Sequence, residues 1–148
     1  MAIRLRSATL DDVPHVLPRT RALNAHEGIQ ITDALLETAL RHLLANPDLG
    51  GVWLVEADSA PIGYAIVTFG YDLEFGGRDA YLTELWIDEP SRGTGAGAEA
   101  LAQLDGELRQ RDIRALHLQV RPENPALRLY QRMGFIASPR LIMTRRLV

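Results

Sequence analysis

Hydrophobic and polar positions alternate along some stretches of this chain and recur every three or four residues along others. Alternation predicts β-strands, and the longer spacing predicts amphipathic helices. Strands are expected at residues 1–6, 51–57, 62–71, 81–87 and 115–120, with two short final strands near Phe135 and over 141–147. Helices are expected after Thr9, after Thr32, over 98–111 and after Asn124.

Capping residues predict where the first helices begin. Thr9 is followed three residues later by Asp12, which is a capping-box pattern. The helix that follows contains Pro14 and Pro18, so it is expected to be short or kinked. The stretch 25–28 is expected to be the loop between the first two helices.

The remaining connections complete a mixed fold. Residues 58–61 join two apolar, β-branched and aromatic runs, which predicts a hairpin. Asn124 is expected to cap the last helix, with Pro125 at its first position and Gly134 at its end. The order β-α-α-β-β-β-α-β-α-β-β predicts an α/β fold, a mixed, mostly antiparallel sheet of about seven strands with helices on both faces. Because no linker or repeat divides the sequence, residues 1–148 are expected to form a single domain.

Composition narrows the classes of function. The net charge of −3 argues against general nucleic-acid binding, which favours a basic surface. No apolar run approaches the length of a membrane span, so no membrane partner is expected and the cytoplasm is the expected location. The absence of cysteine excludes thiolate metal sites, and no His, Asp and Glu cluster has the spacing of metal ligands, so no metal is expected.

The stretch Ser91-Arg92-Gly93-Thr94-Gly95-Ala96-Gly97 joins a predicted strand to a predicted helix. Its alternate glycines allow close approach of the backbone to a ligand, and an arginine beside free helix N-terminal amides indicates an anion, such as a phosphate. A Walker A loop is excluded because Ala98-Glu99 stands where lysine and serine or threonine would be. The dinucleotide fingerprint has a different spacing and an earlier place in the chain. A turn that only packs the helix against the strand is the structural alternative.

Two motifs carry a family resemblance. Arg92-Gly93-Thr94-Gly95-Ala96-Gly97 resembles the R/Q-x-x-G-x-G/A acetyl-coenzyme A signature of the GNAT superfamily of N-acetyltransferases. Residues 124–135 resemble the N-x-x-A-x-x-x-Y-x-x-x-G-F segment of the same family, and residues 76–85 are similar, more weakly, to small-molecule and polyamine acetyltransferases. The predicted order of elements resembles the GNAT fold over nearly the whole chain. The sequence departs from the family pattern at Glu89, where many members have proline, and at Ala96, where a larger aliphatic residue is usual.

The resemblance implies that acetyl-CoA is the cosubstrate. Its pyrophosphate would lie over the amides of the glycine stretch, at a helix N-terminus, with Arg92 adding charge-assisted hydrogen bonds. The backbone of the third long strand would pair with the pantetheine arm and polarise the thioester carbonyl. Asn124 resembles the family residue that hydrogen-bonds the cofactor arm, and a plain helix cap is a compatible alternative role. The residues implied in cofactor binding are Leu85, Trp86, Ile87, Arg92, Gly93, Thr94, Gly95, Ala96, Gly97, Asn124 and Tyr130.

The chemistry of amine acetylation requires a base and an acid. An amine with a pKa near 10.4 arrives protonated, and the leaving thiolate needs a proton. The resemblance implies Glu84 as the base and Tyr130 as the acid, with a surface glutamate and a core tyrosine as the structural alternatives. In a regular strand, Glu84 would point to the same face of the sheet as Leu82. If Leu82 and Leu85 both face inward, the alternation must be interrupted, and a β-bulge as in the family would turn Glu84 to another direction.

The acceptor is expected to be a primary amine of a small molecule, acetylated by direct transfer in a ternary complex, because no extended peptide-binding segment is evident. The candidate substrate-binding residues are His26, Glu27, Asp72, Glu74 and His117. Three alternatives stay open: acetylation of protein N-termini or lysines, a non-catalytic acyl-CoA-binding domain, and a nucleotide-binding regulatory domain. Homodimers are common for this fold, but no residue pattern here requires one.

Overall fold

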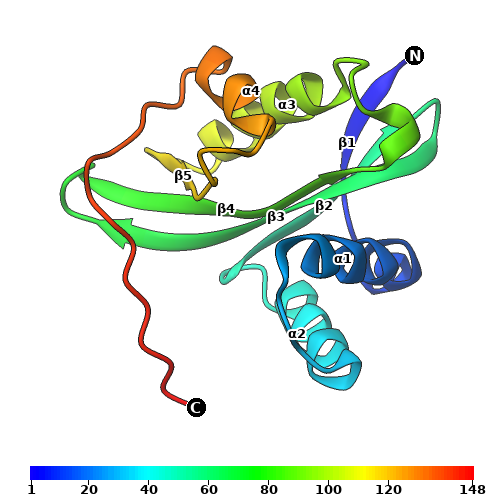
Figure 1. The fold of residues 1–148 in the computed structure, drawn as a ribbon, viewed down its shortest axis with the longest axis horizontal. Helices are drawn as coiled ribbons and strands as arrows, with labels where there is room; N and C mark the ends of the chain where they lie inside the picture. Colours follow the sequence, from blue (N-terminus) through cyan, green and yellow to red (C-terminus); the bar gives the residue numbers. More distant parts are fainter.

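The computed structural model describes residues 1–148 and places a single sheet between two pairs of helices (Figure 1). The strands are β1 (Ile3–Ser7), β2 (Gly50–Ala57), β3 (Ala60–Asp72), β4 (Gly77–Ile87) and β5 (Leu116–Leu118). The helices are α1 (Val13–Glu27), α2 (Asp33–Ala45), α3 (Ala96–Gln110) and α4 (Ala126–Arg132), with two 3-10 turns, η1 (Leu10–Asp12) and η2 (Glu89–Ser91).

The five strands follow the order β1-β2-β3-β4-β5. The first four form antiparallel pairs, and β5 lies parallel to β4 after the crossover through α3. Asp58 and Ser59 form the tight turn between β2 and β3, both with positive φ (50° and 71°). Two left-handed residues in a two-residue turn match the twist of antiparallel strands, which confirms the predicted hairpin.

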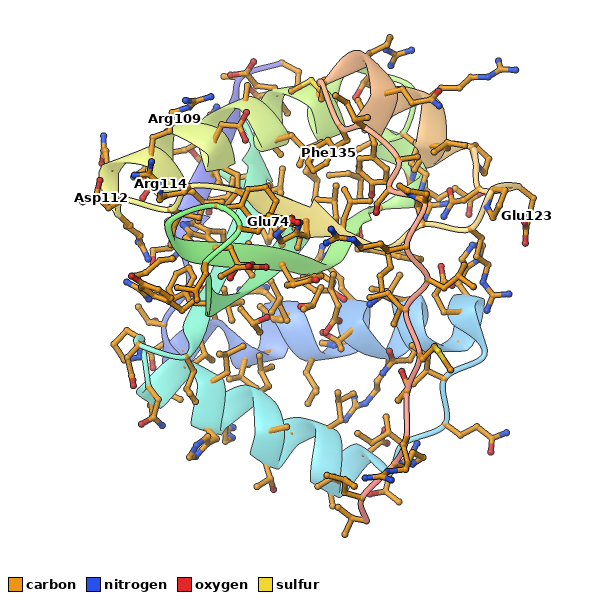
Figure 2. All side chains as sticks on the ribbon, turned by 90° about the vertical axis from the view of Figure 1, so that its left-hand side faces the viewer. Glu74, Arg109, Asp112, Arg114, Glu123 and Phe135 are labelled. Atoms are coloured by element: carbon orange, nitrogen blue, oxygen red, sulfur yellow. The ribbon has the colours of Figure 1, made fainter.

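Both faces of the sheet are buried. Along β2, Val52 and Leu54 pack in the core beneath α1 and α2, whereas Trp53 and Val55 pack in the core beneath α3. Successive side chains of a strand point to opposite faces, so one apolar run serves both cores. Figures 1 and 2 show the two helix layers on opposite sides of the sheet. None of the helices combines the length and the apolarity that crossing a membrane requires.

The prediction of about seven strands was wrong at the C-terminus. No strand forms near Phe135 or over 141–147, and the side chains of Leu141 and Met143 are 88% and 91% exposed. A strand exists only by pairing, and the one open edge near this segment belongs to β5, which is three residues long. The segment instead runs away from α4 past the helices of the opposite face (Figure 1).

The start of α1 agrees with the sequence, but its length does not. Thr9 and Asp12 form the predicted capping box, which opens η1 and leads into α1. The helix is not short but runs for 15 residues: Pro14 lies in the first turn, where no backbone N–H is needed, and Pro18 lies inside the helix, which continues past it. Residues 25–27, expected to be a loop, are the last turn of α1, and Gly28 ends the helix with φ 71°.

The predicted caps of α2 and α4 agree with the structure to within one position, since α4 begins at Ala126 and Pro125 is its N-cap rather than its first residue. The hydroxyl of Thr32 accepts a hydrogen bond from the Leu35 N–H at 3.2 Å, at the start of α2. Asn124 Oδ1 accepts one from the Ala126 N–H at 2.9 Å, at the start of α4. Gly134 follows α4 with φ 92°. These three capping signals depend only on neighbouring residues, so they can be read from the sequence without knowledge of the tertiary structure.

Candidate active site

The glycine loop, residues 91–97, connects η2 to α3 at one end of the sheet. Gly93 and Gly95 have φ of 72° and 88°, and a Cβ added at either position would meet nothing within 4 Å. Glycine is therefore required there by backbone conformation, and the outer surface of the loop is open. The backbone N–H groups from Gly93 to Ala98 make no hydrogen bond within the protein. Free amides at the start of a long helix form a site for an anion.

The third glycine has a different task. A Cβ on Gly97 would lie 3.3 Å from Leu129 Cδ2 of α4. Gly97 thus allows α4 to approach the first turn of α3 closely, in addition to any contact with a ligand. The two motifs that carry the family resemblance, on either side of β5, are therefore packed against each other in space.

Arg92 is folded back against the end of β4. Its Nε donates a hydrogen bond to the Ile87 carbonyl at 2.8 Å, and its guanidinium lies 4.6 Å from the centroid of the Trp86 ring. The positive charge is held at the base of the glycine loop. The contact expected between this charge and a pyrophosphate stays a prediction.

The edge of β4 is free where the cofactor arm is expected. β5 pairs with β4 only over residues 80–82, while β3 pairs with β4 as far as Ile87. The stretch Leu85-Trp86-Ile87 therefore has a strand partner on one side only. An edge of this kind can receive the polar groups of another extended chain, which is what pairing with a pantetheine arm requires.

A β-bulge in β4 sets the direction of Glu84. Leu82 is opposite Val67 and Glu84 is opposite Ile66, so Thr83 is an extra residue in the ladder. The bulge keeps Leu82 in the core beneath α3 and turns Glu84 to the other face, as the resemblance implied. There Glu84 Oε1 accepts a hydrogen bond of 2.7 Å from the hydroxyl of Tyr64.

Burial raises the pKa of Glu84 above its ordinary value, and the hydrogen bond from Tyr64 opposes this increase in part. The pKa of Tyr64 is raised as well, first by burial and then by the charge of Glu84. No cation is hydrogen-bonded to the Glu84 carboxylate. A carboxylate that is partly desolvated and has a neutral partner is a better proton acceptor near neutral pH than an exposed one.

Tyr130 lies on α4, packed against the core beneath α3. Its ring meets Phe135 edge to face, with 5.7 Å between the centroids. Burial raises the pKa of Tyr130, and the negative charge of Glu27 raises it further. Tyr130 therefore keeps its proton at neutral pH, which is the state that an acid requires. Glu27, at the end of α1, also lies 3.5 Å from Arg121.

The other candidate substrate residues are dispersed. His26 is exposed on the last turn of α1. Asp72 and Glu74 lie at the tip of the β3–β4 hairpin, at the opposite end of the sheet from the glycine loop (Figure 1). Asp72 Oδ1 accepts a hydrogen bond from the Glu74 N–H, and the Glu74 carboxylate pairs with Arg140 of the C-terminal segment at 2.9 Å. Figure 2 shows Glu74 on the side of the molecule that this segment crosses.

His117 lies in an aromatic cluster between the β3–β4 hairpin and β5. Its ring is 5.1 Å from that of Phe75 and 4.8 Å from that of Tyr81. Its Nε2 lies 3.1 Å from Asp79 Oδ2. The sequence indicated His117 as a candidate substrate-binding residue but not its contacts with Phe75, Tyr81 and Asp79. It also did not indicate the hydroxyl of Tyr64, because a tyrosine in an apolar strand cannot be distinguished from a core residue.

Comparison with solved structures gave close matches over nearly the whole chain. A protein from Arthrobacter sp. FB24 that is assigned as an acetyltransferase is 30% identical, with a TM-score of 0.81 over 97% of this chain and 96% of that chain. An integron cassette protein from Cole Harbour Salt Marsh is 27% identical, with a TM-score of 0.86 over 97% and 90%. A predicted acetyltransferase from Clostridium acetobutylicum, solved with acetyl-CoA, is 22% identical, with a TM-score of 0.80 over 97% and 96%. No curated protein sequence matched the chain.

The fold, the free backbone N–H groups of the glycine loop and the unpaired edge of β4 together define an enzyme of the acyl-CoA-dependent transferase class. Residues 20–135 match the model of the Acetyltransferase (GNAT) family, and this range includes the glycine loop, Glu84 and Tyr130. The chain therefore belongs to the GNAT family and is an acetyl-CoA-dependent N-acetyltransferase. The structure contains no group of three or more His, Cys, Asp or Glu side chains placed to hold a metal ion.

Proposed function

We propose that this enzyme transfers the acetyl group of acetyl-CoA directly to a primary amine of a small molecule, in a ternary complex. The observation that carries the proposal is the Glu84 carboxylate, turned by a bulge onto the α1 side of the sheet and hydrogen-bonded only by Tyr64. A non-catalytic acyl-CoA-binding domain would have no use for a buried carboxylate with a raised pKa at this point of β4.

Acetyl-CoA would be held by the glycine loop and by the free edge of β4. The amides of Gly93 to Gly97 would receive the pyrophosphate, and the unused nitrogens of Arg92 would add positive charge. The backbone of Leu85-Trp86-Ile87 would pair with the pantetheine arm. The side-chain carbonyl of Asn124 is occupied by the Ala126 N–H, which leaves its amide NH₂ group as a donor to the same arm.

The transfer forms one bond and breaks one. The amine nitrogen attacks the thioester carbonyl carbon, and a backbone N–H of the β4 edge stabilises the oxyanion. Glu84 accepts one proton of the ammonium form of the amine, directly or through a water molecule, and the second proton that the nitrogen loses on becoming an amide passes to solvent. The carbon–sulfur bond then breaks, and the Tyr130 hydroxyl gives its proton to the thiolate of coenzyme A. Two separate residues therefore perform the two proton transfers that involve the protein.

The acceptor is expected to enter from the side of α1. The carboxylate of Glu27 acts on Tyr130 through its charge and would attract a protonated amine toward the thioester. The aromatic faces of Phe75, Tyr81 and His117 provide a second surface that would suit an acceptor carrying a ring or a further cation. His26, Asp72 and Glu74 stay predictions for acceptor binding, Asp72 and Glu74 at a greater distance from the glycine loop (Figure 1).

The proposal is tested by measuring thiol release from acetyl-CoA in the presence of polyamines, aminoglycosides, amino acids and peptides with free N-termini. Turnover with small amines but not with peptides supports it. Turnover with peptides alone would indicate acetylation of protein N-termini or lysines instead. Binding of coenzyme A without turnover of any amine would indicate a non-catalytic domain. Tight binding of ATP or NAD in place of coenzyme A would indicate the nucleotide-binding alternative.

A further inference from the structure

A chain of polar contacts links helix α1 to the glycine loop through the end of β4. Asp88 directly follows β4, and its carboxylate accepts hydrogen bonds from Arg19 Nε at 2.9 Å and from Arg19 Nη2 at 2.7 Å. The same carboxylate accepts a hydrogen bond from the indole N–H of Trp86 at 3.1 Å. Asp88 is therefore the point at which α1 and β4 are joined.

Arg19 is fixed in turn by the backbone around it. Its Nη1 donates to the His15 carbonyl at 2.7 Å, and its Nη2 also donates to the Pro61 carbonyl at 3.0 Å. The side chains of Arg19 and Asp88 are 19% and 30% exposed. A two-pronged, partly buried arginine–carboxylate pair with further backbone partners holds its geometry better than a surface ion pair does.

The series of polar contacts continues from Trp86 to the glycine loop. Trp86 donates its indole N–H to Asp88, and the guanidinium of Arg92 lies over the same ring, 4.6 Å from its centroid. Arg92 Nε donates a hydrogen bond to the Ile87 carbonyl. The Asp88 carbonyl also accepts the Ser91 N–H at 2.9 Å, which closes the turn that leads into the loop. Both the side chain and the backbone of Asp88 thus act on the segment from which the free amides extend.

We propose that Arg19 and Asp88 are positioning residues for acetyl-CoA: they hold Trp86 and Arg92, and through them the glycine loop, in the conformation that receives the pyrophosphate. The inference rests on the proposed role of the loop. A loop that is already ordered loses less conformational freedom when it binds its ligand. Breaking the Arg19–Asp88 pair is therefore expected to weaken acetyl-CoA binding while leaving the proton transfers at Glu84 and Tyr130 intact.

The first test is Asp88→Asn, which keeps the shape of the side chain and removes its charge. We expect the KM for acetyl-CoA and the Kd for coenzyme A to rise about tenfold, the ratio that ~1.4 kcal/mol produces. The kcat and the KM for the amine should change by less than about twofold. Arg19→Gln removes the other partner of the pair and should have the same effect. The double variant should be little worse than either single variant, because both break one contact.

A matched control separates positioning from general stability. Arg6 and Asp12 form another two-pronged pair, at 3.0 and 2.9 Å, which lies before α1 and does not touch the loop. Asp12→Asn should lower the Tm without changing the KM for acetyl-CoA. The chain has 2 tryptophans, so Trp53→Phe leaves Trp86 as the only tryptophan, which can be excited selectively at wavelengths that tyrosine does not absorb. In that background, Asp88→Asn should change the Trp86 emission and weaken its response to coenzyme A.

The result that overturns the inference is a folded Asp88→Asn or Arg19→Gln variant with unchanged KM and Kd. An equal rise in KM for Asp12→Asn would also overturn it, since the effect would then follow stability alone. Binding of coenzyme A is measured here without an amine. A wild-type protein that binds coenzyme A but acetylates nothing would contradict the proposed function and leave this inference standing, whereas one that does not bind coenzyme A would contradict both.

Discussion

Two carboxylates beside α1 are treated in opposite ways by the protein. Asp12, just before the helix, is only 7% exposed, yet its pKa is lowered, chiefly by hydrogen bonds from Arg6. Glu84, in the bulge of β4, is also partly buried, and burial raises its pKa because the hydrogen bond from the neutral hydroxyl of Tyr64 offsets only part of that effect. Burial acts upward on both pKa values, and only the charged partner at Asp12 outweighs it.

The difference separates a structural carboxylate from the proposed base. Asp12 gains by staying ionised, because it holds Arg6 and caps the Thr9 N–H at 2.8 Å. At Glu84 burial disfavours the ionised form, which makes the carboxylate a stronger proton acceptor than an exposed glutamate. The fold places Arg6 at the first site and no arginine or lysine within hydrogen-bond distance of the second.

The largest effect is expected from Glu84→Gln, which should lower kcat by about 100-fold, the lower end of what a general base contributes. Glu84 must be deprotonated to accept a proton, so wild-type activity should rise as the pH passes its raised pKa. That limb should disappear in the variant. The pH–rate profile between pH 5 and 9 checks this. A matched control is Glu107→Gln, which changes a solvent-accessible carboxylate on α3. A variant that keeps the wild-type profile would mean that the base is another group.

Tyr130→Phe examines the opposite half of the proton transfer. It keeps the edge-to-face contact with Phe135 and removes only the hydroxyl. Turnover should fall by about 10- to 100-fold, because general acid catalysis is lost, while the Kd for coenzyme A changes little. Steady-state kinetics and a coenzyme A titration measure the two quantities separately. Unchanged turnover would remove Tyr130 from the mechanism and leave it a core residue.

The comparison also predicts that Asp12→Asn and Glu84→Gln change the free energy of unfolding in opposite directions at neutral pH. Asp12→Asn should lower the free energy of unfolding at pH 7 by about 1–2 kcal/mol, since Arg6 is partly exposed. The lowered pKa of Asp12 means that its contribution is present above its unfolded-state value near 3.9 and is lost as the pH falls further. Wild type and variant should therefore converge in acid.

Glu84→Gln should have the reverse dependence. The raised pKa of Glu84 means that its protonated form suits the fold, and that ionisation in the folded state reduces stability as the pH rises. The glutamine variant should therefore be more stable than wild type at neutral pH and show little difference in acid. Urea unfolding at pH 4 and pH 7 measures both variants. Shifts of the same sign would refute the contrast between the two carboxylates.

The features that sequence could predict are those carried by neighbouring residues. The glycine loop, the caps at Thr32 and Asn124 and the β2–β3 turn each depend on a few adjacent positions, and the structure contains them. The strand expected over 141–147 depends on an edge elsewhere in the fold, and β5 is only three residues long. Local propensity cannot supply that information.

The site itself was predictable in part. The resemblance gave Glu84 and the bulge, and the register of β3 against β4 contains it. The Tyr64 hydroxyl could not be found, since that register joins residues 20 positions apart. The Arg19–Asp88 pair joins residues 69 positions apart, and neither has a neighbour that signals it. Sequence therefore located the candidate catalytic groups and not the side chains that contact them.

The smallest effect is expected from Tyr64→Phe, which tests whether the neutral partner tunes Glu84. The hydrogen bond from Tyr64 favours the ionised carboxylate and partly offsets the effect of burial. Its removal should raise the pKa of Glu84 further, so the rising limb of the pH–rate profile should move to higher pH. Turnover on the plateau should stay within about threefold of wild type, because the base is still present. The measurement is the midpoint of that limb. If it moved to lower pH instead, the Tyr64 hydroxyl would be stabilising the protonated form, and the contrast between a charged partner at Asp12 and a neutral one at Glu84 would need a different physical cause.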